Sequence, residues 1–316
     1  METRRDFSKK SVVVCAALSL PLPGTANGQT VPREFKTRDP KRALILCYSQ
    51  TGFTSRYGKL IGCVLQEKGL VVDLADMRGF DPKRLTGYDL ILVGSPVFYY
   101  DTPANVSDWL AAIPKITGIS VAAFVSFGGP EGNQHNALCH ILHLLAEKEG
   151  IPVGMEAFRS IPSYPATWDS ANQRSGEHLP DEATYNRVRE FAGEILEAVR
   201  QGRVLTYSSE LALREIGRML PLVWLNKRGI TQHTVDGAKC ILCRTCEKKC
   251  PVNAIHPEKR SVDHDKCLAC FGCLNNGPAD AVVMAYGGKK LYGFPEYLRR
   301  RKLKVLEPPE FQHCRL

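Results

Sequence analysis

The sequence predicts a doubly wound α/β domain with a five-stranded parallel sheet, followed by a small α+β domain rich in cysteine. Two observations lead to this prediction. From about residue 42 to residue 202, short apolar segments alternate with segments of helical periodicity. Two blocks of closely spaced cysteines then follow, between residues 240 and 278. Near-continuous apolar strands separated by helices are typical of a parallel sheet that is covered on both faces.

Five apolar segments are the expected strands, and the segments between and after them include four expected helices. The strands are ALILCYS (43–49), VVDLADM (71–77), DLILVGSPV (89–97), SVAAFVSF (120–127) and VGMEAFRS (153–160). The helices cover 55–69, 102–113, about 135–148 and about 181–200. In doubly wound sheets, ligands bind at the carboxyl ends of the strands, near the point where the strand order reverses.

Three loops at that edge predict a flavin mononucleotide (FMN) site. The loop after the first strand combines hydroxyls, a glycine and a helix N-terminus, which suits a phosphate monoester held by amides and hydroxyls. It has no lysine, so it is not a nucleoside-triphosphate loop. The loop after the third strand offers aromatic side chains, and the loop after the fourth offers a glycine-rich bend. The candidate residues are Ser49, Gln50, Thr51, Gly52, Phe53, Thr54, Ser95, Pro96, Val97, Phe98, Tyr99, Phe127, Gly128 and Gly129.

The two cysteine blocks have the spacing of iron–sulfur ligands. The first is CILCRTCEKKCP, with Cys240, Cys243, Cys246 and Cys250 before a proline, as in bacterial-type iron–sulfur sites. The second is CLACFGCLNNGP, in which Gly277 stands where a fourth cysteine is expected. Zinc and disulfides are the alternatives, and seven cysteines at this spacing suit both poorly.

The fourth cysteine of such a motif binds the other cluster. Cys250, Cys267, Cys270 and Cys273 are therefore expected to hold a complete 4Fe–4S cluster. Cys240, Cys243 and Cys246 are expected to hold a second cluster, 4Fe–4S or 3Fe–4S, that lacks its fourth cysteine. Cys314 is a remote candidate for the missing ligand, and loss of this cluster altogether is the alternative.

The first 28 residues are typical of an export signal. Arg4 and Arg5 precede the short apolar run 11–20 and a small-residue exit near Gly28, which resembles a twin-arginine signal. That route exports folded proteins, as a protein that acquires iron–sulfur clusters in the cytoplasm requires. The sequence thus predicts a periplasmic location or one at the outer face of the cytoplasmic membrane. An ordinary basic N-terminus or an early start codon is the alternative.

Positive charge is concentrated near the C-terminus of a chain whose formal net charge is +9. Between residues 289 and 304 the chain has one acidic residue, Glu296. The same segment has seven basic residues: Lys289, Lys290, Arg299, Arg300, Arg301, Lys302 and Lys304. Because this excess is local, it indicates a surface rather than a nucleic-acid-binding protein. The expected partner is a redox protein, acidic in this interpretation; an anionic membrane surface and a solvated tail are alternatives.

The chain resembles the flavodoxin–ferredoxin fusion proteins of anaerobic bacteria, over about 42–200 and 236–305. SQTGFT at 49–54 is similar to the S/T-x-T-G-x-T pattern of flavodoxins. The resemblance implies that the FMN phosphate lies at Ser49, Thr51, Gly52 and Thr54. It implies that the isoalloxazine ring lies near Pro96–Tyr99 and Phe127–Gly129. Members usually keep the eighth cysteine, so Gly277 is a departure from the family pattern.

The expected organisation is a signal (1–28), a flavodoxin-like FMN domain (42–202), a linker with a helix (203–235), a two-cluster ferredoxin-like domain (236–286) and a basic tail (287–316). The expected function is electron transfer between FMN, iron–sulfur clusters and an exported redox partner. An FMN-dependent reductase of a quinone or another small acceptor, and a redox or iron sensor built on the incomplete cluster, are the rival hypotheses. Trp168 either caps the flavin edge or anchors its loop.

Overall fold

A computed structural model describes residues 34–129, 134–168, 176–209 and 222–316. The predicted signal (1–28), residues 130–133 of the glycine-rich loop and residues 210–221 of the predicted linker lie outside the described residues. Residues 34–209, as far as they are described, contain a parallel sheet and its helices, and we call them the sheet region. Residues 222–286 contain the cysteine blocks, and we call them the cysteine region. Both belong to one compact unit of the chain.

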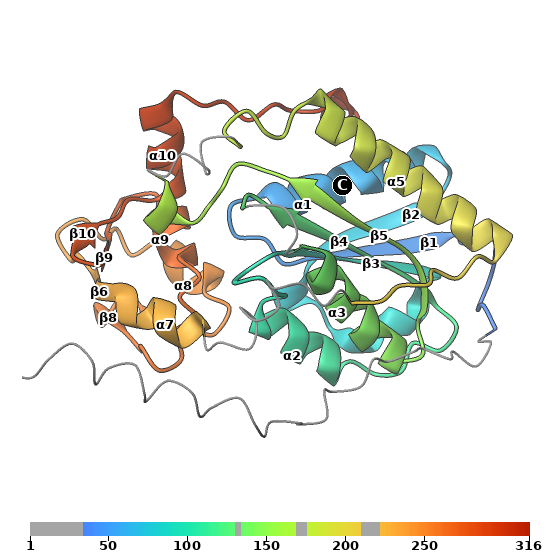
Figure 1. Cartoon of the computed structure of the whole chain (residues 1–316), viewed down its shortest axis with the longest axis horizontal. Coiled ribbons are helices and arrows are strands. Elements are labelled where there is room, and N and C mark those ends of the chain that lie inside the picture. Colours follow the sequence, from blue (N-terminus) through green and yellow to red (C-terminus); the bar gives the residue numbers. More distant parts are fainter. Residues whose placement is uncertain (1–33, 130–133, 169–175, 210–221) are drawn as a thin grey trace, which may run out of the picture. The chain divides into compact units, whose positions relative to one another are not determined.

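The sheet region contains five parallel strands in the order β2-β1-β3-β4-β5 (Figure 1). Their bounds are β1 (Arg42–Cys47), β2 (Val71–Asp76), β3 (Leu90–Pro96), β4 (Ser120–Phe127) and β5 (Ile151–Arg159). This order is that of the flavodoxin-like doubly wound sheet, so the predicted fold class is confirmed. The order reverses between β1 and β3, which places the loops after these two strands side by side at the carboxyl edge.

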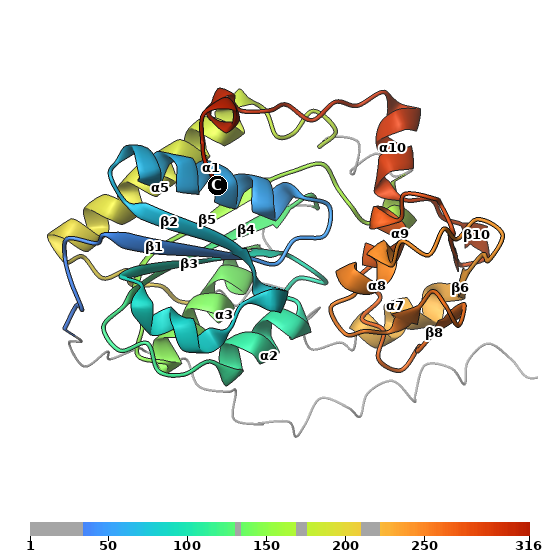
Figure 2. The same ribbon diagram turned by 180° about the vertical axis from the view of Figure 1, so that it is seen from behind.

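Helices cover both faces of this sheet (Figures 1 and 2). α1 (Phe53–Glu67) and α5 (Glu182–Gln201) lie on one face, and α2 (Ala104–Ala112) and α3 (Gln134–Glu147) lie on the other. Alternate strand residues enter the two cores: Ile45 packs with Leu60 of α1, whereas Leu44 packs on the side of Ile141 of α3. Burial on both faces explains why the strands are continuous apolar runs.

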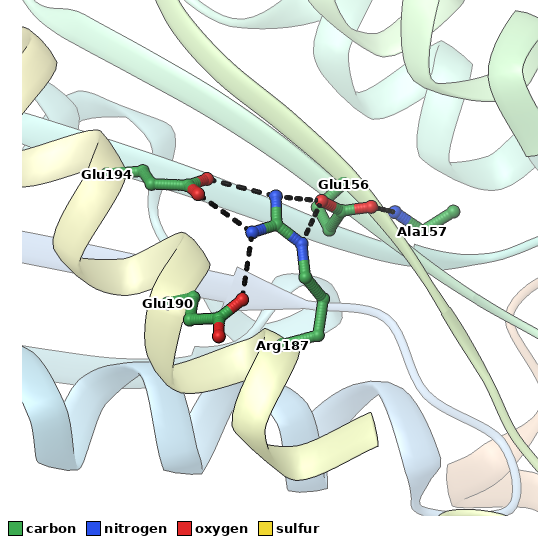
Figure 3. Close-up of polar contacts among 5 residues, drawn as sticks. All are labelled: Glu156, Ala157, Arg187, Glu190 and Glu194. Carbon is green, nitrogen blue, oxygen red and sulfur yellow. Dashed lines mark hydrogen bonds and ion pairs between the residues drawn. The ribbon is translucent and has the colours of Figure 1, made fainter. Parts of the chain in front are cut away.

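The termini of α5 are set by specific residues. The Asp181 side chain accepts a hydrogen bond from the Thr184 amide (2.8 Å), and Gly202 ends the helix in the left-handed region (φ 65°). In the second turn of α5, Arg187 donates to Glu156 of the edge strand β5 (Nε–Oε2, 2.7 Å) and contacts Glu190 and Glu194 (Figure 3). The pair with Glu156 holds α5 to the edge strand, and the other two lie within α5; partial exposure limits the stabilisation that each provides.

The cysteine region is a small antiparallel α+β unit. Its helices and strands are α7 (Leu222–Gly229), β6 (Ile230–Val235), α8 (Thr245–Lys249), β7 (Ile255–His256), β8 (Ser261–Val262), α9 (Gly272–Asn276) and β9 (Val282–Tyr286). β6 pairs with β9, and β7 pairs with β8. Because β6 pairs with β9, residues from Ile230 onward, which lie inside the segment predicted as a linker (203–235), belong to this sheet.

The two cysteine blocks form an internal repeat with an offset of 27 residues, from Cys240 to Cys267. The hydrogen bonds repeat with the same offset. The Cys240 amide donates to the Asp236 carbonyl (3.0 Å), and the Cys267 amide donates to the Asp263 carbonyl (3.1 Å). The left-handed backbone positions repeat as well, with Leu242 at φ 54° and Ala269 at φ 52°. The region therefore holds two copies of one ligand-bearing loop.

The predicted basic tail (287–316) is ordered and returns to the sheet region. It contains β10 (Lys289–Lys290), α10 (Phe294–Arg301) and the short 3-10 helix η4 (Pro309–Gln312). Tyr297 of α10 is buried and stacks on Trp168, with ring centroids 4.4 Å apart. The Trp168 indole also donates to the Pro162 carbonyl (2.9 Å), so Trp168 anchors its loop.

The C-terminal residues of this tail are attached to α1 by a disulfide bond between Cys63 and Cys314. Cys314 is therefore not the missing cluster ligand, which corrects that expectation. The local sequence around either cysteine did not indicate this bond, because the two residues are 251 positions apart. Cys63 is buried, as expected for an apolar run.

Several basic residues of the tail are paired. Arg299 and Arg300 contact Glu296, and Arg301 contacts Glu177 (2.9 Å). The local charge excess is thus partly neutralised by neighbouring carboxylates. Within the described ranges, no helix has both the length and the apolar character needed to cross a membrane.

Candidate functional site: a cavity beside two cysteine clusters

A cavity of about 420 Å³ lies at the carboxyl edge of the parallel sheet. All of the candidate flavin residues line it except Gly52 and Ser95. The Ser95 hydroxyl instead donates to the Pro96 carbonyl (2.9 Å). The loops after β1, β3 and β4 are therefore brought together as the strand order requires. Among the described residues that line the cavity, none is charged.

The loop after β1 has the features of a phosphate cradle. Gly52 adopts φ 94°, a left-handed conformation that favours glycine, and it precedes α1 without any side-chain cap on the helix. The first amides of α1 are thus available to an anion. The Ser49 hydroxyl is buried and has no hydrogen-bond partner among the described residues. Buried hydroxyls are normally paired, so this one points to a ligand, and the set fits an FMN phosphate.

The loop after β3 forms the aromatic wall of the cavity. Phe98 and Asp101 exchange two backbone hydrogen bonds of 2.9 Å, which close a tight turn around Tyr99 and Tyr100. Both tyrosines have left-handed backbones, at φ 49° and 70°. Bulky residues are rare in this conformation, and such strain is often found at binding sites. The Tyr99 hydroxyl donates to the Ala269 carbonyl of the cysteine region (2.6 Å).

Further residues line the cavity that the sequence analysis did not identify. The loop after β5 contributes Ser160, Pro162, Ser163, Tyr164 and Thr167, and its position at the carboxyl edge was a signal that could have found it. Ala269, Cys270 and Phe271 come from the second cysteine block. The Phe271 ring packs edge-on against Tyr164 at 5.1 Å. No local sequence pattern predicts this contact, because more than a hundred residues separate Tyr164 and Phe271.

The cysteines form two groups that correspond to the crossed ligand sets. Cys250, Cys267, Cys270 and Cys273 line one small pocket and interact electrostatically with one another. Cys246 interacts in the same way with Cys240 and Cys243. All seven are free thiols. Within the described residues, no three side chains converge as they would on a single metal ion. Cluster ligands differ in this respect, because each cysteine binds a different iron.

Burial distinguishes the two groups. Burial raises the pKa of the Cys270 thiol to about 12 and the pKa of Cys273 well above its usual value. Such thiols are protonated at neutral pH unless a metal holds them as thiolates. Cys243 is exposed, and its hydrogen bond to the Thr245 hydroxyl lowers its pKa. One group is therefore enclosed by protein, whereas the other reaches the surface.

A comparison with protein families identifies the cysteine region. The family described as "4Fe-4S binding domain" matches residues 233–256, which contain the first cysteine block. The strand order β2-β1-β3-β4-β5 identifies the fold of the sheet region. The chain thus combines a sheet region of flavodoxin-like fold with a cysteine region that matches a 4Fe-4S binding domain. We accordingly call the sheet region the flavodoxin region and the cysteine region the ferredoxin region.

Solved flavodoxin structures are similar to about half of the chain. The flavodoxin of Streptococcus pneumoniae TIGR4 is 16% identical, covers 49% of this chain and 98% of its own length, and has a TM-score of 0.39. Flavodoxin 2 from Bacillus cereus is 21% identical, covers 49% and 98%, and has a TM-score of 0.40. A flavodoxin from the domain Archaea is 20% identical, covers 50% and 99%, and has a TM-score of 0.38. None of the curated proteins compared with the chain matches it.

Gln50 joins the flavodoxin region to the ferredoxin region. It belongs to the loop after β1, and its side chain hydrogen-bonds to the sulfur of Cys270. Its amide nitrogen also donates to the Tyr48 hydroxyl (3.2 Å). A Cβ atom at Gly272 would approach this nitrogen to 2.8 Å, so the glycine permits the close packing. The candidate flavin loop and a candidate cluster ligand are thus in direct contact.

The enclosed cysteine group has a second hydrogen-bonding neighbour, His233 of β6. Its Nε2 lies 3.2 Å from the Cys273 sulfur, and the side chain is buried. Burial, followed by repulsion from His264, lowers the pKa of His233 to about 4, so the ring is neutral at physiological pH. A neutral imidazole can donate one hydrogen bond to a sulfur.

Proposed function

We propose that this protein transfers electrons between FMN and iron–sulfur clusters and exchanges them with an exported redox partner. The observation that carries the proposal is the shared wall: Cys270 lines both the cavity and the pocket of the four enclosed cysteines. When bound, FMN supplies one- and two-electron chemistry and an iron–sulfur cluster supplies one-electron chemistry. The shared wall favours an electron carrier that joins the FMN site to the cluster site. A candidate cluster ligand, rather than a substrate, occupies this side of the cavity.

The residues of the flavodoxin region would bind and orient FMN. The Ser49 hydroxyl and the first amides of α1 are available to the phosphate, and the described side chains around the remaining space are uncharged. An uncharged cradle holds a dianion through oriented dipoles rather than through ion pairs. The Tyr99 turn and the Gly128–Gly129 bend would enclose the ring and exclude water from it.

The residues of the ferredoxin region would hold two clusters of different completeness. Cys250, Cys267, Cys270 and Cys273 fit a complete 4Fe–4S cluster, since all four line one pocket. Cys240, Cys243 and Cys246 would hold a 3Fe–4S or a labile 4Fe–4S cluster. The backbone at Gly277 keeps the conformation found at Cys250, which supports retention of this second site over its loss.

Export by the twin-arginine route is part of the proposal. The signal-like segment with Arg4 and Arg5 motivates it, and the Cys63–Cys314 disulfide bond supports it. Disulfides persist in oxidising compartments and are rare in the cytosol. Replacing Arg4 and Arg5 by lysine should leave a cluster-loaded precursor in the cytoplasm, as fractionation and mass spectrometry would show. Wild-type protein found uncleaved in the cytoplasm would contradict this part.

Anaerobic purification tests the central proposal. One FMN and about seven or eight iron atoms per chain are expected, the iron count reflecting one complete cluster and one of three or four irons. Mixing the oxidised protein with a limiting reductant should then bleach the flavin and cluster absorbances together. If the purified protein neither contains FMN nor takes it up, the proposed two-electron chemistry of FMN is wrong.

A further inference from the structure

The two ligand-bearing loops of the ferredoxin region have the same backbone conformation, but one is buried and the other is exposed. Ala269 and Phe271 of the second loop correspond to Leu242 and Arg244 of the first, with φ of 52° and 57° against 54° and 58°. The second loop is covered by the flavodoxin region: Ala269 is 1% exposed and Phe271 is 2% exposed. Its contacts are the Tyr99 hydroxyl on the Ala269 carbonyl and the Tyr164 ring on Phe271.

The equivalent surface of the first loop is uncovered and apolar. Ile241 is 67% exposed and Leu242 is 57% exposed, the latter at the position of the buried Ala269. Cys243, between Leu242 and Arg244, is exposed as well. Large apolar side chains this exposed beside a candidate cluster ligand are typical of a surface that another protein covers.

The surroundings of this apolar surface are basic. Lys239 and Lys248 are exposed and flank the loop in sequence. From residue 236 to residue 260 the chain carries six basic residues against three acidic ones, a formal excess of +3. Arg244 is engaged with Glu258 and Glu247, so the excess is carried by the lysines and by Arg260. A partner with an acidic face would be attracted to this surface and oriented by it.

We infer that Ile241 and Leu242, with Lys239 and Lys248 at their rim, form the docking surface for an acidic one-electron carrier protein. The inference rests on the proposed electron-transfer function and names its partner surface. The internal repeat supports this inference. The loop that contains Cys270 is covered by the flavodoxin region of the same chain. The corresponding loop that contains Cys243 is exposed and could contact a separate redox protein. An apolar centre with a charged rim suits a small, transient interface.

The test measures electron transfer into the holoprotein by stopped-flow absorbance. Reduced plant-type ferredoxin, a small acidic one-electron carrier, is the probe, and dithionite is the small reductant. The variants are Ile241→Gln with Leu242→Asn, since asparagine tolerates a left-handed backbone, and Lys239→Glu with Lys248→Glu. Val71→Gln and Lys68→Glu are the matched controls, because both side chains are exposed and lie at the amino end of β2, opposite the ligand loops.

We expect each double variant to lower the second-order rate constant with ferredoxin by about tenfold, as loss of a central contact or of steering charge does. The lysine variant should also lose most of the salt dependence. The controls should keep the wild-type rate, and dithionite should reduce every protein alike.

Other outcomes would overturn the inference in distinguishable ways. Wild-type rates in both double variants would show that the acidic carrier docks elsewhere, while the proposed function stands. Co-sedimentation with phosphatidylglycerol vesicles that only the Ile241/Leu242 variant loses would assign the surface to a membrane. Failure of dithionite to reduce any cofactor in the wild type would instead remove the proposed function itself.

Discussion

Gly277 has the backbone conformation of Cys250, its counterpart in the internal repeat. The two residues end α9 and α8 with φ and ψ of −72° and 117° and of −76° and 117°, respectively. Each precedes a proline. A Cβ atom built at Gly277 would have the Cys273 carbonyl oxygen as its nearest neighbour, at 3.4 Å. The chain thus lacks a thiolate at this position but keeps the space and direction that a cysteine would need.

Gly277→Cys should restore a complete second cluster. The oxidised wild type should show the electron paramagnetic resonance signal of a 3Fe–4S centre, or lose iron readily from a labile 4Fe–4S centre. In the variant that signal should disappear, and the iron content should rise to about eight per chain, as expected for two 4Fe–4S clusters.

Asn276→Cys is the matched control for this substitution. It adds a thiol one residue earlier, inside α9, where the Asn276 side chain donates to the Gly272 carbonyl (2.8 Å). It should leave the wild-type signal unchanged. Two equivalent 4Fe–4S clusters in the wild type would mean that another group supplies the fourth ligand.

Thr51→Val should weaken FMN binding. Thr51 lines the cavity in the phosphate loop, and a hydrogen bond to a charged group contributes about 1.5–3 kcal/mol. The dissociation constant should therefore rise by about 10- to 150-fold, as measured by flavin fluorescence on titration of the flavin-free protein. Thr86→Val, at an exposed threonine outside the cavity, should have no effect. Equal affinities for the two variants would place the phosphate elsewhere.

Local patterns in the sequence predicted much of the fold and the grouping of the candidate ligands. The strand segments are visible because each is buried on both faces, so apolar residues run without interruption from Ala43 to Cys47. The separation of Cys250 from its own block follows from the spacing of the motif. Both features depend on residues close together in the chain.

Contacts between distant segments could not be predicted in this way. Tyr99 was expected to face a flavin, and its sequence context gives no sign that its hydroxyl binds Ala269, 170 residues later. Cys63 and Cys314 lie in unrelated local patterns, so their bond depends on the path of the tail over α1. Such pairs are properties of tertiary packing, which single-segment periodicity does not encode.

Gln50→Leu should lower the reduction potential of the complete cluster. Hydrogen bonds to cluster and cysteine sulfurs stabilise the more negative, reduced state, and Gln50 supplies one to Cys270. A net value of about 0.5–1.5 kcal/mol corresponds to roughly 20–65 mV for one electron. A potential titration followed by electron paramagnetic resonance measures the shift. Gln134→Leu, on another wall of the cavity, should leave the potential unchanged.

Attachment of the tail to α5 should depend on pH. Glu310 accepts hydrogen bonds from Arg189 (Oε2–Nη2, 3.1 Å), and this partner lowers the pKa of the carboxyl below its usual value. The carboxylate therefore contributes stability above about pH 4.5, and the contribution is lost as the pH falls through the lowered pKa. Glu310→Gln should thus reduce the free energy of unfolding by more at pH 6 than at pH 3.

The difference between wild type and variant is the quantity to measure in this experiment. Acid releases iron–sulfur clusters from both proteins, so the absolute stabilities below pH 5 are not informative. Urea unfolding at each pH, followed by tryptophan fluorescence, gives the difference directly. A difference of the same size at pH 3 as at pH 6 would show that Glu310 acts through packing rather than through its charge.

Cys314→Ser should detach the end of the tail from α1. The disulfide bond closes a loop across 251 residues, and removing a native disulfide typically costs about 2–5 kcal/mol. The remaining contacts of this segment, such as Lys59 over the Phe311 ring at 4.6 Å, are individually weak. The variant should therefore unfold at a lower urea concentration and be cleaved earlier by trypsin in the segment 302–304.

Cys63→Ser, and the double variant, should show the same loss of stability, because all three variants remove one disulfide bond. Reductant should destabilise the wild type alone. Titration of both thiols in the native exported protein, or additive effects of the two substitutions, would show that the bond does not form.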